Sequence, residues 1–391
     1  MPPTASGSTA SRSRPTGLGS RVSSRGALLR ERHGLGPLVV AMEPTSHFWK
    51  IVAHALEALG VPYVLVSGFV VARSRELDNL TRDKTDLRDA GLIADLAAEL
   101  RFSEARLAAG PWAELELLAE ARNARSVERT AALTEQRALL ELVWPRLLAD
   151  CPDLSGTHLQ ALLRTGLTPQ QVEAMPEREF LEVLTAAHRP RRFMAAMARR
   201  LQAAAAGVEP FPETAAAILR CRLAAWRIRG AEEAIEELEA VMSGLFEATG
   251  LGWMRGQIRG LGDPVLVSLL GLAGDPRRFD DAGCLVKLAG SNPTERSSGE
   301  RQAAGGIHRR GRPTLRHVAV GASVTLVRHN PDFRARFLAL TAEDRPHRLT
   351  PKQAFVAVAN KLLRTLWAMA VTGLAYRSEI ARGEVRPPIA A

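Results

Sequence analysis

A chain of 391 residues in which 46% are hydrophobic is long enough for two or three domains that each bury a core. Its net charge of +10 and isoelectric point near 10.4 favour a polyanionic partner, nucleic acid before membrane, because no basic amphipathic helix or long apolar run stands out. The three cysteines, Cys151, Cys221 and Cys284, are isolated, which excludes a disulfide framework and zinc-site spacing and fits a reducing cytoplasm.

Residues 1–34 are rich in Ser, Arg, Gly and Pro and contain no acidic residue before Glu31. This composition is typical of an organelle transit peptide, but the segment has no plausible apolar face. We therefore expect a disordered tail or a wrongly assigned start codon.

Apolar segments at 38–42 and 63–66 flank a segment at 46–59 with helical spacing, which predicts two parallel strands joined by a crossover helix. Thr85 is expected to cap a further helix. The inner face of that helix would consist of Leu92, Ile93 and Leu96. The segment therefore predicts half of a small α/β domain.

Three carboxylates lie at the ends of these elements. Asp86 and Asp89 are three residues apart, so one helical turn places them on one face, and Glu43 follows the first strand. Oxygen ligands of this kind suit Mg²⁺ or Mn²⁺. The alternative for the Asp pair is a capping arrangement that complements the helix dipole.

The middle of the chain is predicted to be helical, with long helices at 111–149 and 213–248 separated by a proline-broken region. Heptad-like apolar spacing in the second helix predicts an antiparallel arm or a dimerising helix. Arg122, Arg125 and Arg129 share a face of the first helix, which is either a nucleic-acid contact or an ordinary solvated face.

A Gly-Leu-Gly turn at 260–262 precedes a proline-started helix. Such a turn resembles a helix-hairpin-helix element, in which the backbone N–H groups at Gly260 and Gly262 would cradle a phosphate. A plain turn between helices is the alternative.

Ser297 and Ser298 precede Gly299 in a strongly cationic segment. A serine that attacks a phosphodiester needs positive charge around the scissile phosphate. The arginines that could supply it are Arg296, Arg301, Arg309, Arg310, Arg312 and Arg316. Ser-Ser-Gly is otherwise a flexible turn.

Together these segments resemble the transposases of the insertion-sequence 110/116/902 family. The resemblance rests on Met-Glu-Pro-Thr-Ser-His-Phe-Trp at 42–49, Lys-Thr-Asp-Leu-Arg-Asp-Ala at 84–90, the Gly-Leu-Gly turn and Gly-Asp-Pro-Arg-Arg-Phe at 274–279. It continues through Ser-Ser-Gly at 297–299 and His-Arg-Arg-Gly at 308–311. The motifs occur in order over residues 38 to 370, so the series is more specific than any one of them.

The resemblance implies a RuvC-like, ribonuclease-H-type domain with an Asp-Glu-Asp-Asp tetrad, a helical coiled-coil insertion and a mainly helical C-terminal transposase domain with a catalytic serine. Glu43, Asp86 and Asp89 match the last three acids of the tetrad and would be the metal ligands. Ser298 best matches the nucleophile, and Ser297 is the alternative. The implied domains are a tail at 1–34, an incomplete RuvC-like domain at 35–105, a helical region at 106–250, the C-terminal domain at 251–375 and a tail at 376–391.

One departure concerns the first acid of the tetrad, which the family carries on its opening strand. No Asp precedes Asp78 in this chain, so that strand and one metal ligand are expected to be missing. The expectation has two explanations: a full-length gene with a misread start, or a decayed copy.

The sequence thus predicts a mixed α/β and α protein and two main functions. The first is a DNA recombinase of an insertion sequence, in which Mg²⁺ assists and Ser298 forms a phosphoserine link. The resemblance implies RNA guidance and a homo-oligomer, a dimer or tetramer, in the bacterial cytoplasm near the nucleoid. The second is an inactive remnant that still binds DNA or RNA. A simple RuvC-like nuclease is a third possibility, but it would have no use for the serine loop.

Overall fold

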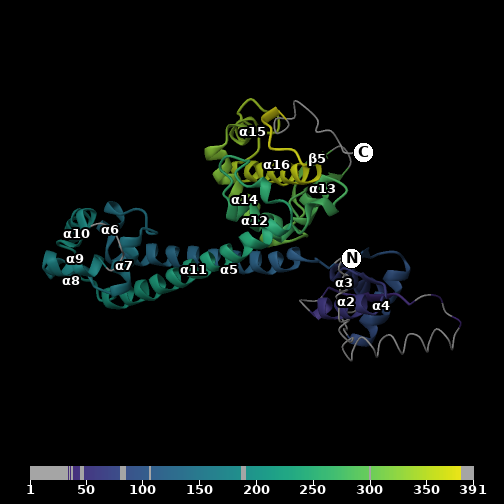
Figure 1. The fold of residues 1–391 in the computed structure, drawn as a ribbon, viewed down its shortest axis with the longest axis horizontal. Coiled ribbons are helices and arrows are strands. Elements are labelled where there is room, and N and C mark those ends of the chain that lie inside the picture. Colours follow the sequence, from purple (N-terminus) through teal and green to yellow (C-terminus); the bar gives the residue numbers. More distant parts are fainter. Residues whose placement is uncertain are drawn as a thin grey trace, which may run out of the picture. The chain divides into compact units, whose positions relative to one another are not determined.

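The computed structural model describes residues 34, 36, 38–44, 48–79, 85–104, 107–185, 191–298 and 301–379. They form two compact units, residues 1–109 and residues 110–391, which are described separately (Figure 1). Most of the predicted tail at 1–34 and the tail after 379 lie outside the described residues.

The first unit contains a small mixed sheet covered by helices. Its elements are β1 (Val40–Met42), α2 (Phe48–Ala58), β2 (Tyr63–Leu65), α3 (Gly68–Asn79), α4 (Asp86–Ala98) and β3 (Ser103–Glu104). Strands β1 and β2 pair in parallel, and β3 pairs antiparallel to β2. The predicted parallel crossover is therefore confirmed, whereas α3 was not predicted because its apolar residues, Phe69, Val70 and Val71, adjoin each other without helical spacing.

Helix α4 begins as its sequence predicts. The side chain of Thr85 accepts a hydrogen bond from the backbone N–H of Arg88, which satisfies a donor that the first helical turn leaves unpaired. Leu96 is buried with Val66 and Val71, and Leu92 and Ile93 pack against this core. The inner face of α4 is the predicted one.

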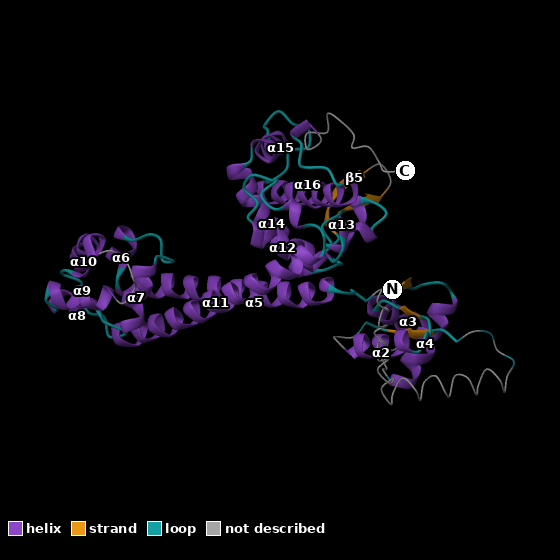
Figure 2. Ribbon diagram, viewed as in Figure 1, coloured by secondary structure: helices purple, strands orange, loops and turns teal. Residues whose placement is uncertain are grey.

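In its described residues, the regular structure of the second unit is helical apart from one hairpin, as the secondary-structure colouring shows (Figure 2). Its first half contains α5 (Pro111–Val143), α6 (Pro145–Asp150), α7 (Thr157–Thr165), α8 (Pro169–Ala174), α9 (Glu177–Thr185), α10 (Arg191–Ala205) and α11 (Thr214–Ala248). Its second half contains η1 (Gly252–Met254), α12 (Asp263–Ala273), η2 (Pro276–Arg278), α13 (Ala282–Leu288), β4 (Pro293–Ser298), β5 (Arg301–Ile307), α14 (Pro313–His329), α15 (Pro331–Thr341) and α16 (Pro351–Thr372).

Helices α5 and α11 lie side by side as an antiparallel arm (Figure 1). The pairing of Arg122 with Glu239 and of Arg129 with Glu232 fixes the antiparallel direction. The first helix was expected to run to residue 149, but it ends at Val143. Pro145 has no N–H to donate and disfavours helical geometry at Trp144, so a new helix begins there.

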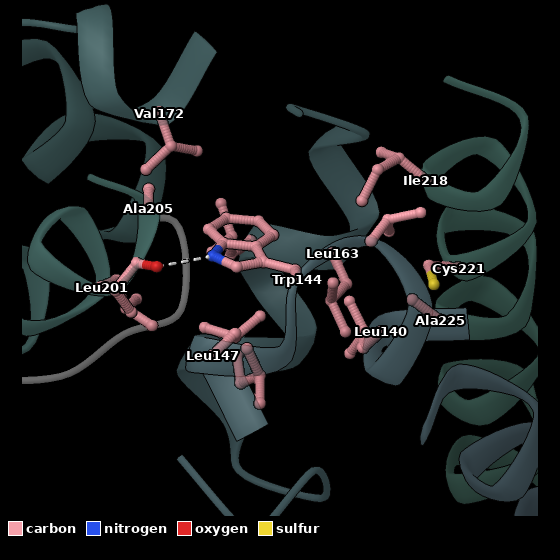
Figure 3. Packing of buried hydrophobic residues seen from close by; sticks show 14 of the residues in the cluster. Leu140, Trp144, Leu147, Leu163, Val172, Leu201, Ala205, Ile218, Cys221 and Ala225 are labelled. Carbon is pink, nitrogen blue, oxygen red and sulfur yellow. Dashed lines mark hydrogen bonds between the residues drawn. The ribbon is translucent and has the colours of Figure 1, made fainter. Parts of the chain in front are cut away.

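The short helices α6 to α10 bury a core against the end of the arm (Figure 3). Trp144 lies at its centre, fully buried, and its indole N–H donates to the carbonyl of Ala204 at 3.0 Å. Cys221 is buried in the same core, and this burial raises the pKa of its thiol to about 12. The thiol therefore stays protonated and acts as a small apolar side chain.

Helix α16 is the core helix of the second half. It is long and apolar enough to span a membrane by length and composition, but Leu362, Leu363 and Leu366 are buried inside the protein. A capping box at Thr350 begins the helix, and left-handed Gly373 ends it. These three leucines belong to the buried core of this half.

Candidate functional site

The candidate site residues fall in both units. Glu43, Asp86 and Asp89 belong to the first, and the serines and the arginines to the second. Each unit is therefore considered by itself.

Asp89 is the most buried of the three carboxylates, and an arginine side chain forms an ion pair with it. The Arg75 guanidinium donates from Nε to Asp89 Oδ1 at 2.7 Å and from Nη2 to Asp89 Oδ2 at 2.8 Å. Both side chains are largely buried, with 15% and 11% of their surfaces exposed. Both oxygens that would face a metal ion therefore accept bonds from a cation that joins α3 to α4.

Glu43 follows β1, and its carboxylate lies against the start of α3. A methyl group at Gly68 would come within 2.3 Å of Glu43 Oε1, so the carboxylate covers the first residue of α3, where the helix dipole favours negative charge. Gly68 and Arg75 are seven residues apart, about 10 Å along the helix at about 1.5 Å per residue. Asp86 is exposed in the first turn of α4.

The family that the sequence resembles implies a divalent metal, and these carboxylates do not fit one as arranged. Within the described ranges, no group of three or more His, Cys, Asp or Glu side chains is placed to hold a metal ion. A groove of about 1020 Å³ lies in this unit, but its lining is mostly apolar, from β1, β2, α4 and the segments next to them, and the three carboxylates are absent from it. We therefore assign no chemical step to a metal.

Asp89 is expected to contribute to stability through Arg75. Asp89→Asn should lower the free energy of unfolding by about 2–4 kcal/mol, because it leaves a largely buried guanidinium without its counter-charge. Asp86→Asn, at an exposed position on the same helix, should cost about 1 kcal/mol or less. Urea unfolding of both variants measures the difference; equal, small effects would contradict a structural role for Asp89.

The serines lie on the β4–β5 hairpin of the second unit. Ser298 is the last residue of β4 and pairs in register with Arg301, and Ser297 pairs with Gln302. Arg296 pairs with Ala303 on the same ribbon. The backbone register therefore places Arg296 and Arg301 near Ser298, at the end of the hairpin away from its root.

The other arginines of the predicted cationic pocket lie at the root of the hairpin. Pro293, five residues before Ser298, pairs with Ile307, so about 17 Å of strand separates the two ends. Arg312 Nη1 donates to the carbonyl of Leu272 at 2.7 Å, and Arg316 Nη1 donates to that of Ala289, also at 2.7 Å. These two guanidinium groups cap helix ends.

Backbone contacts explain the glycines at this root. Gly311 has a φ of +153°, and a Cβ there would meet the Leu288 carbonyl oxygen at 2.5 Å and the Gly290 nitrogen at 2.6 Å. The Arg309 N–H donates to the Gly290 carbonyl at 2.9 Å, and Arg309 and Arg310 themselves are exposed. The His-Arg-Arg-Gly motif thus anchors the hairpin.

The Gly-Leu-Gly turn has a packing role. A Cβ at Gly260, where φ is +86°, would lie 2.9 Å from His329 Cβ on α14. Gly262 precedes α12, and Asp263 in the first turn of that helix accepts a bond from the Gly256 N–H at 3.2 Å. This carboxylate would repel a phosphate at the turn, so the geometry favours the plain turn between helices.

Two of the three arginines predicted to contact nucleic acid on α5 join the helices of the arm. Arg122 Nε donates to Glu239 Oε1, and Arg129 Nε donates to Glu232 Oε1, both at 2.7 Å. Arg125 pairs with Glu128 on its own helix. The sequence placed these arginines on one face of a helix, but it did not indicate their partners. Glu239 is 117 residues from Arg122, and Glu232 is 103 residues from Arg129.

Three contacts in or beside the candidate sites were not predicted from the sequence. Arg75 binds Asp89, the Glu43 carboxylate lies against Gly68, and Ser291 binds Asn360. Ser291 Oγ donates to Asn360 Oδ1 at 2.5 Å, and Asn360 Nδ2 donates to the Ser291 carbonyl at 3.0 Å. No local signal could reveal this last pair, because 69 residues separate its members.

Comparisons with known proteins match both units. A family model described as "Transposase", for DEDD transposases of the IS110 group, matches residues 20–145, and its match begins inside the segment 1–34. A second model, described as "Transposase IS116/IS110/IS902 family", matches residues 256–338, which include the hairpin.

Two curated relatives carry transposase names. A family 20 transposase of Pseudomonas aeruginosa is 30% identical over 123 residues, 31% of this chain and 35% of that protein. A transposase designated y4pF/y4sB of Sinorhizobium fredii is 29% identical over 144 residues, 37% of each chain. The chain thus spans little more than a third of the curated relatives it matches. Because the two family models match the α/β unit and the hairpin region in order, this chain belongs to the IS110/IS116/IS902 family of transposases.

Proposed function

We propose that the chain is a DNA transposase that recombines an insertion sequence through a phosphoserine link formed by Ser298, with Ser297 as the alternative nucleophile. The observation that carries the proposal is the hairpin register, which pairs Ser298 with Arg301 inside the segment that matches the transposase family. A hairpin end can project from a helical body toward a DNA strand, as a nucleophile for a bulky substrate must.

The proposed step is a displacement at phosphorus. Ser298 Oγ attacks the scissile phosphodiester, a phosphorus–Oγ bond forms, and the bond from phosphorus to one deoxyribose oxygen breaks. The serine proton passes to that leaving oxygen, which becomes a hydroxyl. Arg296 and Arg301 occupy the register positions from which a guanidinium could offset the charge on the phosphate.

The proposed partners are DNA, a guide RNA and further copies of the chain. The net charge of +10 and the exposed Arg309 and Arg310 at the hairpin root support binding to a polyanion. Leu219, Leu223 and Trp226 are about half exposed on α11 at intervals of four and three residues. This apolar stripe along the arm supports assembly into a dimer or tetramer. The bacterial cytoplasm, near the nucleoid, is the proposed location.

A covalent-product assay tests the proposal. The chain is incubated with duplex DNA that spans the ends of the element around its own gene, and the products are separated under denaturing conditions. A protein–DNA product that survives detergent and yields phosphoserine on digestion is expected. Binding of the same DNA should weaken steeply with salt, because each neutralised phosphate releases counterions.

An inactive remnant that retains nucleic-acid binding is the second candidate. The observation that favours it is the Arg75–Asp89 pair, which leaves the carboxylates without the arrangement of a metal site. Salt-dependent DNA binding without any covalent product would support the remnant and overturn the transposase.

A further inference from the structure

Arg312 lies where four helices of the second unit meet. Its backbone N–H donates to the carbonyl of Leu288 at 2.7 Å, at the end of α13, and Arg312 itself directly precedes α14. Its Nη1 atom donates to the carbonyl of Leu272 on α12 at 2.7 Å and lies 3.1 Å from Glu116 Oε2 on α5. One arginine therefore joins the arm to the two helices that precede and follow the β4–β5 hairpin in the chain.

Glu116 is the member of this ion pair that the arm supplies. It lies in the second turn of α5, and only 11% of its side chain is exposed. Burial of a carboxylate costs hydration, and the ion pair that offsets this cost often adds no net stability over apolar residues of the same volume. What such a pair does add is direction, because the guanidinium must point at the carboxylate.

The arm and α12 approach each other closely beside this ion pair. A Cβ at Gly271 on α12 would lie 2.9 Å from the carbonyl oxygen of Leu115, the residue before Glu116. The backbones of the two helices therefore meet at a position where a larger residue would not fit. Packing of this density resists small shifts, so the ion pair lies on a firm contact between the arm and α12.

Backbone hydrogen bonds tie the root of the hairpin to the same arginine. The N–H of Arg309 donates to the Gly290 carbonyl at 2.9 Å, so the segment that leads from β5 to Arg312 is held against the segment before β4. About 17 Å of strand separates this root from Ser298 at the end of β4. A tilt of about 5° at the root would therefore move that end by about 1.5 Å.

We propose that Glu116 is a positioning residue for the serine: through Arg312 it sets the direction of the β4–β5 hairpin, and so where Ser298 meets the scissile phosphodiester. The inference rests on the proposed function for the role of Ser298, whereas the link from Glu116 to the hairpin root rests on the contacts above. A displacement of about 1 Å at a reacting atom can slow a reaction by about a hundredfold, so the effect of a lost ion pair is measurable.

Glu116→Gln tests this role in the full chain. The control is Glu239→Gln, which removes the carboxylate partner of Arg122, another arginine of the arm, and leaves the hairpin root untouched. Each variant receives saturating duplex DNA that spans the ends of the element, and the covalent product is followed through a single turnover. Glu116→Gln should lower the rate constant by about tenfold or more at an unchanged DNA affinity, and Glu239→Gln should keep the rate constant.

A merely structural role would change a different quantity. Loss of folded protein lowers the melting temperature and the amount of product, but it leaves the rate constant of the folded molecules unchanged. Arg312→Gln combined with Glu116→Gln should be no slower than Arg312→Gln alone, because the carboxylate acts through the arginine. If Glu116→Gln does not fold, Glu116→Asp takes its place with the same expected direction, since it keeps the charge and shortens the side chain.

Hydrogen exchange of the DNA-free chain tests the link without the reaction. Glu116→Gln should speed exchange of the Arg309 and Arg312 amides by about tenfold relative to Glu239→Gln, because the hairpin root loses one of its supports. An unchanged rate constant or unchanged exchange in the folded variant would overturn the positioning role, as would a double variant slower than either single one. Faster exchange, together with no covalent product from the unmodified chain, would sustain the link to the hairpin and overturn the transposase.

Discussion

Ser298→Ala is expected to abolish the detergent-resistant protein–DNA product and to leave DNA affinity within about twofold of the original. Removal of the hydroxyl removes the atom that forms the bond to phosphorus, whereas one neutral hydroxyl contributes little to binding on a strongly cationic chain. The product is measured by denaturing electrophoresis of labelled DNA, and affinity is measured on the same preparation.

Ser297→Ala is the matched control, because it removes the same group one residue earlier on the same strand. It should retain most of the covalent product. A product from Ser298→Ala that disappears with Ser297→Ala would transfer the role to Ser297, and a product from both variants would place the nucleophile elsewhere.

Trp144→Ala is expected to reduce the free energy of unfolding by about 3–5 kcal/mol, the range for truncation of a large aromatic side chain in a core. The indole is fully buried at the junction of α5 and α6, and its removal also leaves the Ala204 carbonyl without its donor. Chemical unfolding followed by circular dichroism measures the change.

Trp226→Ala provides the comparison for the same type of side chain. Trp226 is 49% exposed on α11. It lies beside the guanidinium groups of Arg164 and Arg229, at 6.0 and 5.8 Å from its ring centroid. Such exposed cation–π contacts contribute about 0.5–1 kcal/mol, so this variant should lose about 1 kcal/mol or less. A loss equal to that of Trp144→Ala would contradict the core assignment.

Much of the local structure followed from the sequence. The apolar segments at 38–42 and 63–66 predicted the parallel pair, Thr85 predicted the start of α4, and the proline after Gly-Leu-Gly predicted the start of α12. Each of these features depends on residues that are neighbours in the chain, through side-chain periodicity, capping hydrogen bonds or the missing N–H of proline. One expectation of this kind was wrong, because Pro145 ends the first long helix inside a segment that was predicted to be helical to residue 149.

The pairing of the two arm helices could be predicted only in part from the sequence. The spacing of apolar residues predicted two long helices and allowed either an antiparallel arm or a dimerising helix. The antiparallel pairing of the two helices is shown by ion pairs such as Arg122 with Glu239, whose members are 117 residues apart. The sequence shows which side chains share a face of a helix, but the packing of the whole unit decides which residues that face contacts.

The sequence by itself determined the family, the type and order of most elements, and which residues could carry chemistry. The tertiary structure decided which of those residues are engaged by others: Arg75 holds both oxygens of Asp89, and Arg312 and Arg316 cap helix ends. The physical reason is that periodicity and capping act over a few residues, whereas a charge pairs with whatever the fold brings within about 4 Å of it.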